Sequence, residues 1–394
     1  MSLNKILQYE YFNIHMKLLR YLIPHMQESL NKKMVFLGGP RQVGKTTLSL
    51  QFLKSPSIEN PAYLNWDRNT DRIQILKDQF PLQENKILVL DELHKYSKWR
   101  NLIKGLFDKY HTKNQFIITG SARLDYFRKG GDSLLGRYRY FRLHPFSVME
   151  MNKNPNKNDL DILLKFGGFP EPLFSQNEKE HRIWQNDRMI KVASEDIRDL
   201  ENIKDISSML LLAEMLPARV GSPLSLKSIS EDLQVSQPTV DRWIEILSTL
   251  YYCYTIAPFG SPKIRAVRKL KKLYLWDWSQ VEEYGFRFEN LVASHLLKYC
   301  HFITDTEGYP MEIRYLRDTD GREIDFVVLK NKKPLFAVEC KTGEKALSPH
   351  ISYFQARTEI PEFFQVHMGT KDFGSNKTGR VLPFVKFCKE MGMI

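Results

Sequence analysis

A glycine-rich segment with the pattern G-x-x-x-x-G-K-[ST] constrains this chain more than any other feature. The pattern covers residues 39–46, after an apolar run at 34–37 and before the helical spacing of residues 48–53. Glycines let a backbone wrap around an anion, and the amides at a helix start supply positive potential. The segment therefore predicts a phosphate-binding loop, and a chain that binds ATP or a related nucleotide. A glycine-rich turn without a ligand is the alternative.

The residues of this loop have separate expected roles. Lys45 is expected to reach the terminal phosphates, and the hydroxyl of Thr46 is expected to ligate Mg2+. The remaining positions would surround the phosphates with backbone amides. The expected nucleotide-binding loop comprises Gly39, Pro40, Arg41, Gln42, Val43, Gly44, Lys45, Thr46 and Thr47.

Composition and charge place the chain in a broad class. Its 394 residues suffice for two or three domains, and 42% hydrophobic with 26% charged residues is ordinary for a globular protein. No apolar run approaches the roughly 18 residues of a membrane span. Four widely spaced cysteines show no metal or disulfide pattern. We expect a cytoplasmic protein without membrane contact. The net charge of +12 favours polyanions such as DNA, although generic surface lysines explain it equally well.

Further apolar segments at 62–66, 87–90 and 116–118 have the rhythm of a parallel α/β sheet. The second of them ends in Asp91 and Glu92. Ligands bind at the carboxyl ends of strands in open α/β sheets, so both acids are expected beside the phosphate loop. Asp91 is expected to hold Mg2+ through water, and Glu92 to polarise the attacking water in hydrolysis.

Two more polar residues are candidates for the same site. Ser121 ends the sequence Thr-Gly-Ser after the apolar segment at 116–118, and could sense the γ-phosphate; a simple Ser/Gly turn is the alternative. Arg137 precedes a β-like run at 138–143. It could contact phosphate or act as an arginine finger across the boundary of a homo-oligomer, and a surface arginine is an equally good interpretation.

These motifs together resemble one prokaryotic family, the predicted ATPases of the AAA+ superfamily of the archaeal-ATPase-like kind (AAA_14), which carry a C-terminal domain of unknown function (DUF4143). The resemblance rests on order and spacing across residues 30–150, and Gly-Gly-Phe-Pro at 167–170 resembles the start of the family's helical lid. It implies a five-stranded core in which the strand before Ser121 lies between the phosphate-loop strand and the Asp-Glu strand. The motifs that carry it are residues 38–47, residues 91–96 with Trp99, residues 119–121 and residues 136–137.

The middle of the chain is predicted to be mostly helical. Residues 151–158 are polar and turn-rich, which indicates a linker or exposed loop, and apolar stripes predict helices within 180–216. Residues 222–259 carry a helix–turn–helix pattern followed by a wing strand. Its second helix exposes Asp241 and Glu245, and carboxylates near DNA phosphates weaken binding. DNA contact and a packing or protein-binding role therefore both stay open.

The densest basic run follows this pattern. It could track a nucleic-acid backbone or be a solvated linker, and part of it could be structural. Its members are Lys263, Arg265, Arg268, Lys269, Lys271 and Lys272.

Near the C-terminus, two strand-like segments at 323–329 and 335–341 flank an expected hairpin loop at 330–334. Centring the turn on Lys332 places Asp325 opposite Glu339. Period-two geometry then puts both acids on one face, together with Glu323 and Lys341, and puts Ile324, Phe326, Val338 and Cys340 on the other. Directly opposed carboxylates destabilise a sheet unless a cation lies between them, so the arrangement asks for a metal ion.

The pattern Asp…Glu-x-Lys on adjacent strands resembles the PD-(D/E)xK nuclease core. The resemblance implies that Asp325 and Glu339 hold Mg2+ or Mn2+ and that Lys341 activates the hydrolytic water. In such nucleases the preceding helix often gives another acid, and Glu289 matches that position. The alternative is a salt-bridged strand pair, Glu339 with Lys341 and Glu323 with Arg322.

We expect an α/β protein with four parts. These are an AAA+-like P-loop NTPase domain with a parallel sheet at 1–150, a helical lid or linker at 151–221, a winged-helix module at 222–272 and an α/β restriction-endonuclease-like domain at 273–394. The expected function is hydrolysis of Mg-ATP coupled to DNA binding or metal-dependent DNA cleavage. The alternative is a non-nucleolytic ATP-dependent switch that binds a protein partner.

Overall fold

Unbroken apolar runs in the first third of the chain form a five-stranded sheet in a computed structural model, which describes residues 20–81, 86–120, 134–191, 205–260 and 270–394. The strands are β1 (Met34–Gly38), β2 (Tyr63–Asn65), β3 (Ile87–Asp91), β4 (Gln115–Thr119) and β5 (Tyr138–Arg142). Their order is β2-β3-β4-β1-β5, and every neighbouring pair is parallel. The predicted parallel sheet and the strand order implied by the family resemblance are confirmed.

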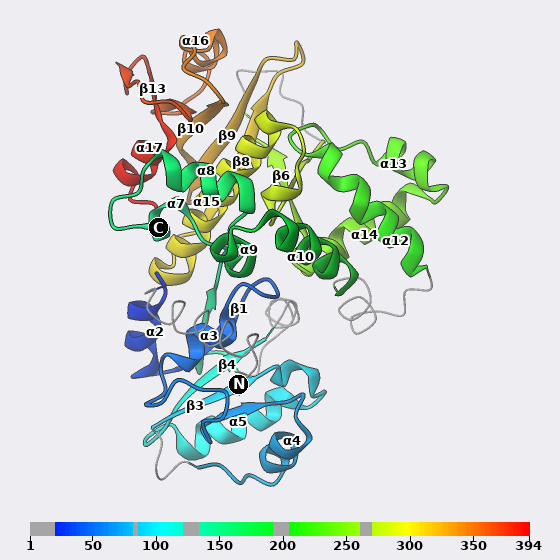
Figure 1. Ribbon diagram of the computed structural model, residues 1–394. Coiled ribbons are helices and arrows are strands. Elements are labelled where there is room, and N and C mark those ends of the chain that lie inside the picture. The colour runs from blue at the N-terminus through cyan, green and yellow to red at the C-terminus, as the bar shows by residue number, and fades with distance from the viewer. Residues whose placement is uncertain (1–19, 82–85, 121–133, 192–204, 261–269) are drawn as a thin grey trace. The chain divides into compact units, whose positions relative to one another are not determined.

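Helices pack against this sheet, and β1 is buried along its whole length. Burial on both faces is usual for parallel strands. Phe36 of β1, for example, stacks on Tyr138 at 4.3 Å between ring centroids and also contacts Trp99 at 5.9 Å. The helical segments are α2 (Ile23–Leu30), α3 (Lys45–Leu50), α4 (Asn69–Leu76), the 3-10 turn η1 (Leu93–Lys95) and α5 (Trp99–Tyr110). These elements form the first of two units of the chain, Met1–His144 (Figure 1).

The second unit, Pro145–Ile394, begins with helices. They are α7 (Val148–Met151), α8 (Lys157–Phe166), α9 (Pro170–Ser175), α10 (Glu178–Lys191), α12 (Ile206–Met215) and the 3-10 turn η3 (Leu216–Arg219). The unit boundary lies close to the predicted domain boundary at residue 150. The three segments predicted to follow that boundary share this one unit. No helix of the described residues is long and apolar enough to cross a membrane.

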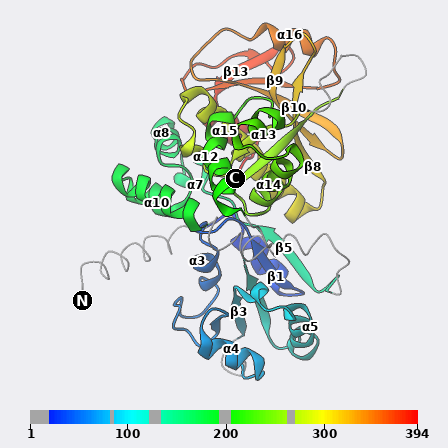
Figure 2. The same ribbon diagram turned by 90° about the vertical axis from the view of Figure 1, so that its right-hand side faces the viewer.

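A helix–turn–helix follows, with α13 (Leu226–Leu233) and α14 (Gln237–Thr249) in contact (Figures 1 and 2). Gln234 ends α13 in the left-handed conformation, and the Ser236 hydroxyl caps α14 by accepting from the backbone N–H of Thr239. Strand β6 (Cys253–Pro258) comes next. The predicted helices and strand of this segment are confirmed as elements.

The rest of the unit is an eight-stranded mixed sheet in the order β12-β13-β11-β10-β9-β8-β6-β7. Its remaining strands are β7 (Lys272–Leu275), β8 (Met311–Arg317), β9 (Glu323–Lys330), β10 (Lys333–Lys341), β11 (Phe363–His367), β12 (Phe373–Ser375) and β13 (Gly379–Pro383). The accompanying helices are η4 (Trp278–Gln280), α15 (Tyr284–Glu307), α16 (Pro349–Gln355) and α17 (Phe384–Glu390). Val327 and Ala337 pack in one core cluster with Ile351 of α16, while Phe336 contacts Phe387 of α17.

The hairpin of β9 and β10 differs from the predicted loop but keeps its register. The turn is only Asn331 and Lys332, at φ of 52° and 64°, which is the left-handed pair that tight hairpins favour. A bulge between Pro334 and Phe336 adds one residue to β10, after which Val338 pairs with Phe326. The shorter turn and the bulge together reproduce the predicted pairing that directs Asp325 toward Glu339.

Strict alternation along β9 is, however, interrupted. Ile324 and Val327 belong to the same core cluster, although an odd spacing places residues of a regular strand on opposite faces. The cause is an irregularity in the pairing with β8, where Arg314 pairs with Val327 and Leu316 with Ile324. The prediction of Ile324 and Phe326 on one common face was therefore wrong.

Candidate functional sites

The phosphate-loop sequence connects β1 to α3, as predicted. Gly39 has φ of 137°, and a Cβ atom there would collide with the carbonyl oxygen of Leu143, so the position requires glycine. Gly44 takes the left-handed conformation at the start of α3. The ammonium group of Lys45 is buried and donates to the carbonyls of Gly39 at 3.0 Å and Pro40 at 2.7 Å. The loop thus closes around a positive charge.

Asp91 lies at the carboxyl end of β3 and is only 3% exposed. Its Oδ2 accepts from the hydroxyls of Thr46 at 2.8 Å and Tyr63 at 2.7 Å. Its Oδ1 accepts from the Thr119 hydroxyl and from the backbone N–H of Glu92 at 3.1 Å. These donors are all neutral, so they orient the carboxylate without cancelling its charge. The structure brings Thr46 and Asp91 together as predicted.

Tyr63 and Thr119 were missed as site residues by sequence reasoning. Tyr63 lies on β2 and Thr119 on β4, the two strands that flank β3. The hydroxyl of Tyr63 also accepts from the side-chain amide of Asn65 at 3.1 Å. A sequence signal for both residues was available. Each carries a hydroxyl group on a strand next to the one that ends in Asp91, and adjacent parallel strands end at the same edge of the sheet.

Glu92 follows directly and has the left-handed φ of 55°. Its Oε2 lies 3.6 Å from Nζ of Lys95 and 3.7 Å from Nε2 of His94. Burial and, second, the charge of Asp91 raise the pKa of the Glu92 carboxyl. A carboxylate with a raised pKa is a stronger base than an ordinary one, which suits the role predicted for this residue.

The last two candidates of this unit have different outcomes. Ser121 lies outside the described residues. Arg137 directs its guanidinium to Asp108, with Nε at 2.8 Å and Nη2 at 3.3 Å from the two carboxylate oxygens. Its role at the nucleotide stays a prediction.

In the second unit, the predicted acids gather around the β9–β10 hairpin and α15. Nζ of Lys341 donates to Oε1 of Glu339 at 2.7 Å, and Oδ2 of Asp325 accepts from the backbone N–H of Cys340 at 2.7 Å. Glu289 of α15 is buried. The charge of Asp325 acts on Glu289 and on Glu339, so the three acids form one electrostatic cluster. The charge of Glu323 also acts on Glu289 and on Glu339. We call the four residues Glu289, Glu323, Asp325 and Glu339 the acidic cluster.

Cations of the chain itself accompany this cluster. Nζ of Lys272 lies 3.4 Å from Oε1 of Glu289 and also donates to Glu323. Nη1 of Arg317 donates to Oε2 of Glu323 at 2.9 Å, and the hydroxyl of Tyr274 donates to Glu289 at 2.7 Å. Lys272 is 1% exposed, so it belongs to the structural part of the basic run. The opposed acids Asp325 and Glu339 were predicted to ask for a metal ion. In the structure Lys341 contacts Glu339, while Lys272 and Arg317 contact the neighbouring acids of the cluster.

Burial dominates the ionisation of the cluster. It raises the pKa of Glu289 and of Glu339 to about 8, with the charge of Asp325 as the second cause in each case. Burial also raises the pKa of Asp325, against the effect of Lys272. Among the residues that the structure describes, no group of three or more histidine, cysteine, aspartate or glutamate side chains is arranged to hold a metal ion.

Comparison with known families agrees with the geometry of the first unit. Residues 31–152 match the family model described as AAA domain. The chain carries an AAA domain. Behind this AAA domain, residues 157–281 match a domain of unknown function, DUF8612, and residues 284–387 match another, DUF4143. The predicted combination of an AAA_14 domain with a C-terminal DUF4143 domain is confirmed.

Two proteins that are similar to this chain in sequence are described as uncharacterized. One from Mycobacterium tuberculosis is 24% identical over 248 residues, which cover 62% of this chain and 54% of the relative. One from Methanocaldococcus jannaschii is 22% identical over 382 residues, covering 81% and 77%. The chain thus spans only about half the length of the mycobacterial relative. Among solved structures, the Thermotoga maritima RuvB Holliday junction branch migration motor matches at 18% identity, covering 64% of this chain and 91% of that one, with a TM-score of only 0.28.

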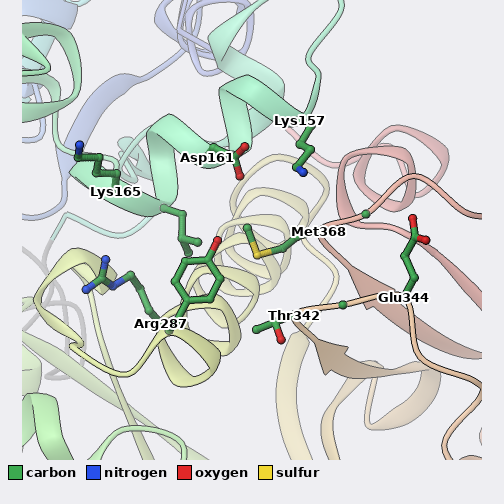
Figure 3. A pocket seen from close by; sticks show the side chains of 11 residues that line it. Lys157, Asp161, Lys165, Arg287, Thr342, Glu344 and Met368 are labelled. Carbon is green, nitrogen blue, oxygen red and sulfur yellow. The ribbon is translucent and has the colours of Figure 1, made fainter.

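A separate pocket of about 640 Å³ lies outside the AAA domain (Figure 3). Lys157, Asp161 and Lys165 of α8 line it together with Arg287 of α15. Glu344, also in the lining, accepts from the backbone N–H groups of Thr370 and Lys371, which lowers its pKa to about 2. The lining mixes both signs of charge and includes none of the predicted site residues.

Proposed function

We propose that the AAA domain hydrolyses Mg-ATP. The observation that carries the proposal is the hydrogen bond from the Thr46 hydroxyl to the buried Asp91 carboxylate, at 2.8 Å, beside a loop that encloses the Lys45 ammonium. The loop fits a nucleotide phosphate because Gly39 leaves no room for a side chain and lets the backbone approach an anion. The match to an AAA domain supports the same activity.

Each residue has a proposed role in that reaction. Lys45 would exchange its bonds to loop carbonyls for bonds to phosphate oxygens, and Thr46 with Asp91 would hold Mg2+. Mg-ATP would supply the phosphoanhydride bond and the charge of the metal. Glu92 would accept a proton from the attacking water, while Ser121 and Arg137 would contact the terminal phosphate.

The test is a phosphate-release assay on the full chain with ATP and Mg2+. We expect hydrolysis that Lys45→Ala and Glu92→Gln each abolish. Glu92→Gln should still bind a fluorescent ATP analogue, because it keeps the phosphate loop. Hydrolysis at an unchanged rate in both variants would contradict the proposal.

We also propose that α8 to α12 act as a helical lid, that α13 and α14 with β6 as the wing strand form a winged helix, and that the C-terminal sheet has a restriction-endonuclease-like fold. DNA is the proposed partner on the basis of the net charge of +12. The exposed face of α14 presents Asp241 and Glu245 beside Arg242, which favours a protein partner for that helix. Stimulation of ATP hydrolysis by DNA would support DNA as the partner. Absence of stimulation by both single-stranded and duplex DNA would support a protein partner.

For the C-terminal domain we propose a non-cleaving role. In the cleaving alternative, Asp325, Glu339 and Glu289 would hold Mg2+ or Mn2+ and Lys341 would activate water. Glu339 is 4% exposed, and its Oε2 accepts no hydrogen bond from described residues, which favours that alternative. Glu289 and Glu323, however, are paired with cations of the chain. Cleavage of DNA with Mg2+ or Mn2+, lost in Asp325→Ala while ATP hydrolysis persists, would overturn the non-cleaving role.

A further inference from the structure

We propose that Lys272 is the resident cation of the acidic cluster and that the cluster works without a divalent metal ion. This inference deepens the non-cleaving role proposed above and rests on it. It assigns to a side chain the place that the resemblance to nucleases assigns to Mg2+ or Mn2+.

Lys272 is built into the cluster from outside the nuclease-like pattern. It lies on β7, before α15, and its side chain is 1% exposed. Its ammonium group contacts Glu289 of α15 at 3.4 Å and donates to Glu323 of β9. It also lies 5.5 Å from the centre of the Tyr315 ring, within range of a cation–π contact. One buried cation thus joins a strand, a helix and a second strand.

One oxygen of Glu289 already has two partners. Oε1 accepts from the hydroxyl of Tyr274 at 2.7 Å and lies 3.4 Å from Nζ of Lys272. Glu289 as a whole is buried. A metal ion bound at Oε1 would have to displace these two donors.

Charge leads to the same conclusion. The four carboxylates of the acidic cluster lie beside three cations, Lys272, Arg317 and Lys341, which pair with Glu289, Glu323 and Glu339. When all are ionised, the group carries one net negative charge, and a divalent ion would make it positive. Buried charges are tolerated when they are paired in this way, whereas removal of one partner leaves an uncompensated charge. The ammonium of Lys272 thus pairs with Glu289 and Glu323, and its charge also acts on Asp325.

The position of β7 gives the cluster a structural role. The backbone of Lys272 bridges to Pro223, at the start of the segment that contains α13 and α14. Through its side chain the same residue holds α15 and β9. The acidic cluster therefore ties the helix–turn–helix segment to the C-terminal sheet.

The test is binding of Mn2+ to nucleotide-free full-length protein, followed by the electron paramagnetic resonance signal of the free ion. In the unmodified chain we expect no Mn2+ site that depends on Asp325, so Asp325→Asn should leave Mn2+ binding unchanged. Lys272→Met should create such a site and bind Mn2+ at least tenfold more tightly than the unmodified chain does. Asp325→Asn added to Lys272→Met should remove this site again. Lys298→Met is the matched control, because Lys298 is another buried lysine, paired with Glu150 away from the cluster.

The outcomes separate the two proposals. A Mn2+ site in the unmodified chain that Asp325→Asn abolishes, without DNA cleavage, would overturn the inference and leave the non-cleaving role intact. The same site with DNA cleavage would overturn both. Absence of a gained site in both Lys272→Met and Lys272→Gln would show that Lys272 is not what excludes the metal. If either variant fails to fold, the comparison of the unmodified chain with Asp325→Asn still shows whether the acidic cluster binds Mn2+.

Discussion

The two units of this protein each bury carboxylates, and they hold them in opposite ways. Asp91 accepts from three hydroxyls and one backbone amide, none of which carries a charge. In the acidic cluster, Glu289, Glu323 and Glu339 instead pair with lysine or arginine. Neutral donors fix a carboxylate in space and leave its charge to attract a cation, whereas charged partners cancel it. This difference is the physical basis of the two proposals, a metal-dependent site in the AAA domain and a structural one in the C-terminal domain.

The largest expected effect comes from removal of the resident cation. Lys272→Met should lower the free energy of unfolding of the second unit by about 3 to 5 kcal/mol, because it leaves the buried Glu289 without a cationic partner. Denaturant unfolding monitored by tryptophan fluorescence would measure it. Thr119→Val, which removes one neutral donor from Asp91, should cost only about 1 to 2 kcal/mol. Equal losses in the two variants would contradict the proposed difference between charged and neutral partners.

The second prediction separates the two acids by activity. Asp91→Asn should lower Mg2+-dependent ATP hydrolysis about 100-fold, because the amide no longer attracts the cation. Asp325→Asn should leave hydrolysis unchanged, since its carboxylate lies in the other unit. Steady-state phosphate release at several Mg2+ concentrations would measure both. A comparable loss in Asp325→Asn would contradict the assignment.

The stability of the folded chain is expected to depend on pH through Glu339. The pKa of Glu339, raised from 4.5 to about 8, means that the folded chain keeps a proton that the unfolded chain releases in this interval. Stability should therefore fall as pH rises from about 4.5 to 8, by at most about 1.4 kcal/mol per pH unit for this group. Glu339→Gln should flatten that slope in denaturant unfolding. The exposed Glu359→Gln is the control and should leave the slope as it is.

The smallest expected effect concerns the neutral donors of Asp91. Tyr63→Phe removes one of the donors that orient Asp91 and should raise the Mg2+ concentration for half-maximal binding of a fluorescent ADP about tenfold. The rate of hydrolysis at saturating Mg2+ should change little, because Thr119 and the Glu92 amide still hold the carboxylate. Tyr110→Phe, the same change at a tyrosine that contacts Asp78, should have no effect. An unchanged Mg2+ requirement in Tyr63→Phe would show that its hydroxyl does not position Asp91.

Local patterns in the sequence determined much of the architecture. The phosphate loop between β1 and α3 and the strands before Asp91 and Gly120 follow from short motifs and from apolar runs. The same holds for α13 and α14, whose caps and apolar spacing lie within a few residues of one another. Each of these features depends on neighbours along the chain, so the sequence alone contains the information.

What tertiary structure decided is which distant side chains meet. Tyr63 reaches Asp91 across 28 residues, and Lys272 reaches Glu323 across 51. No local pattern distinguishes a buried lysine such as Lys272 from an exposed one in the same basic run. The pairing of Asp325 with Glu339 was readable from strand register, but the lysine that contacts Glu289 and Glu323 comes from a strand outside the pattern. Charge compensation in a buried site depends on all elements that pack there, and only the fold brings them together.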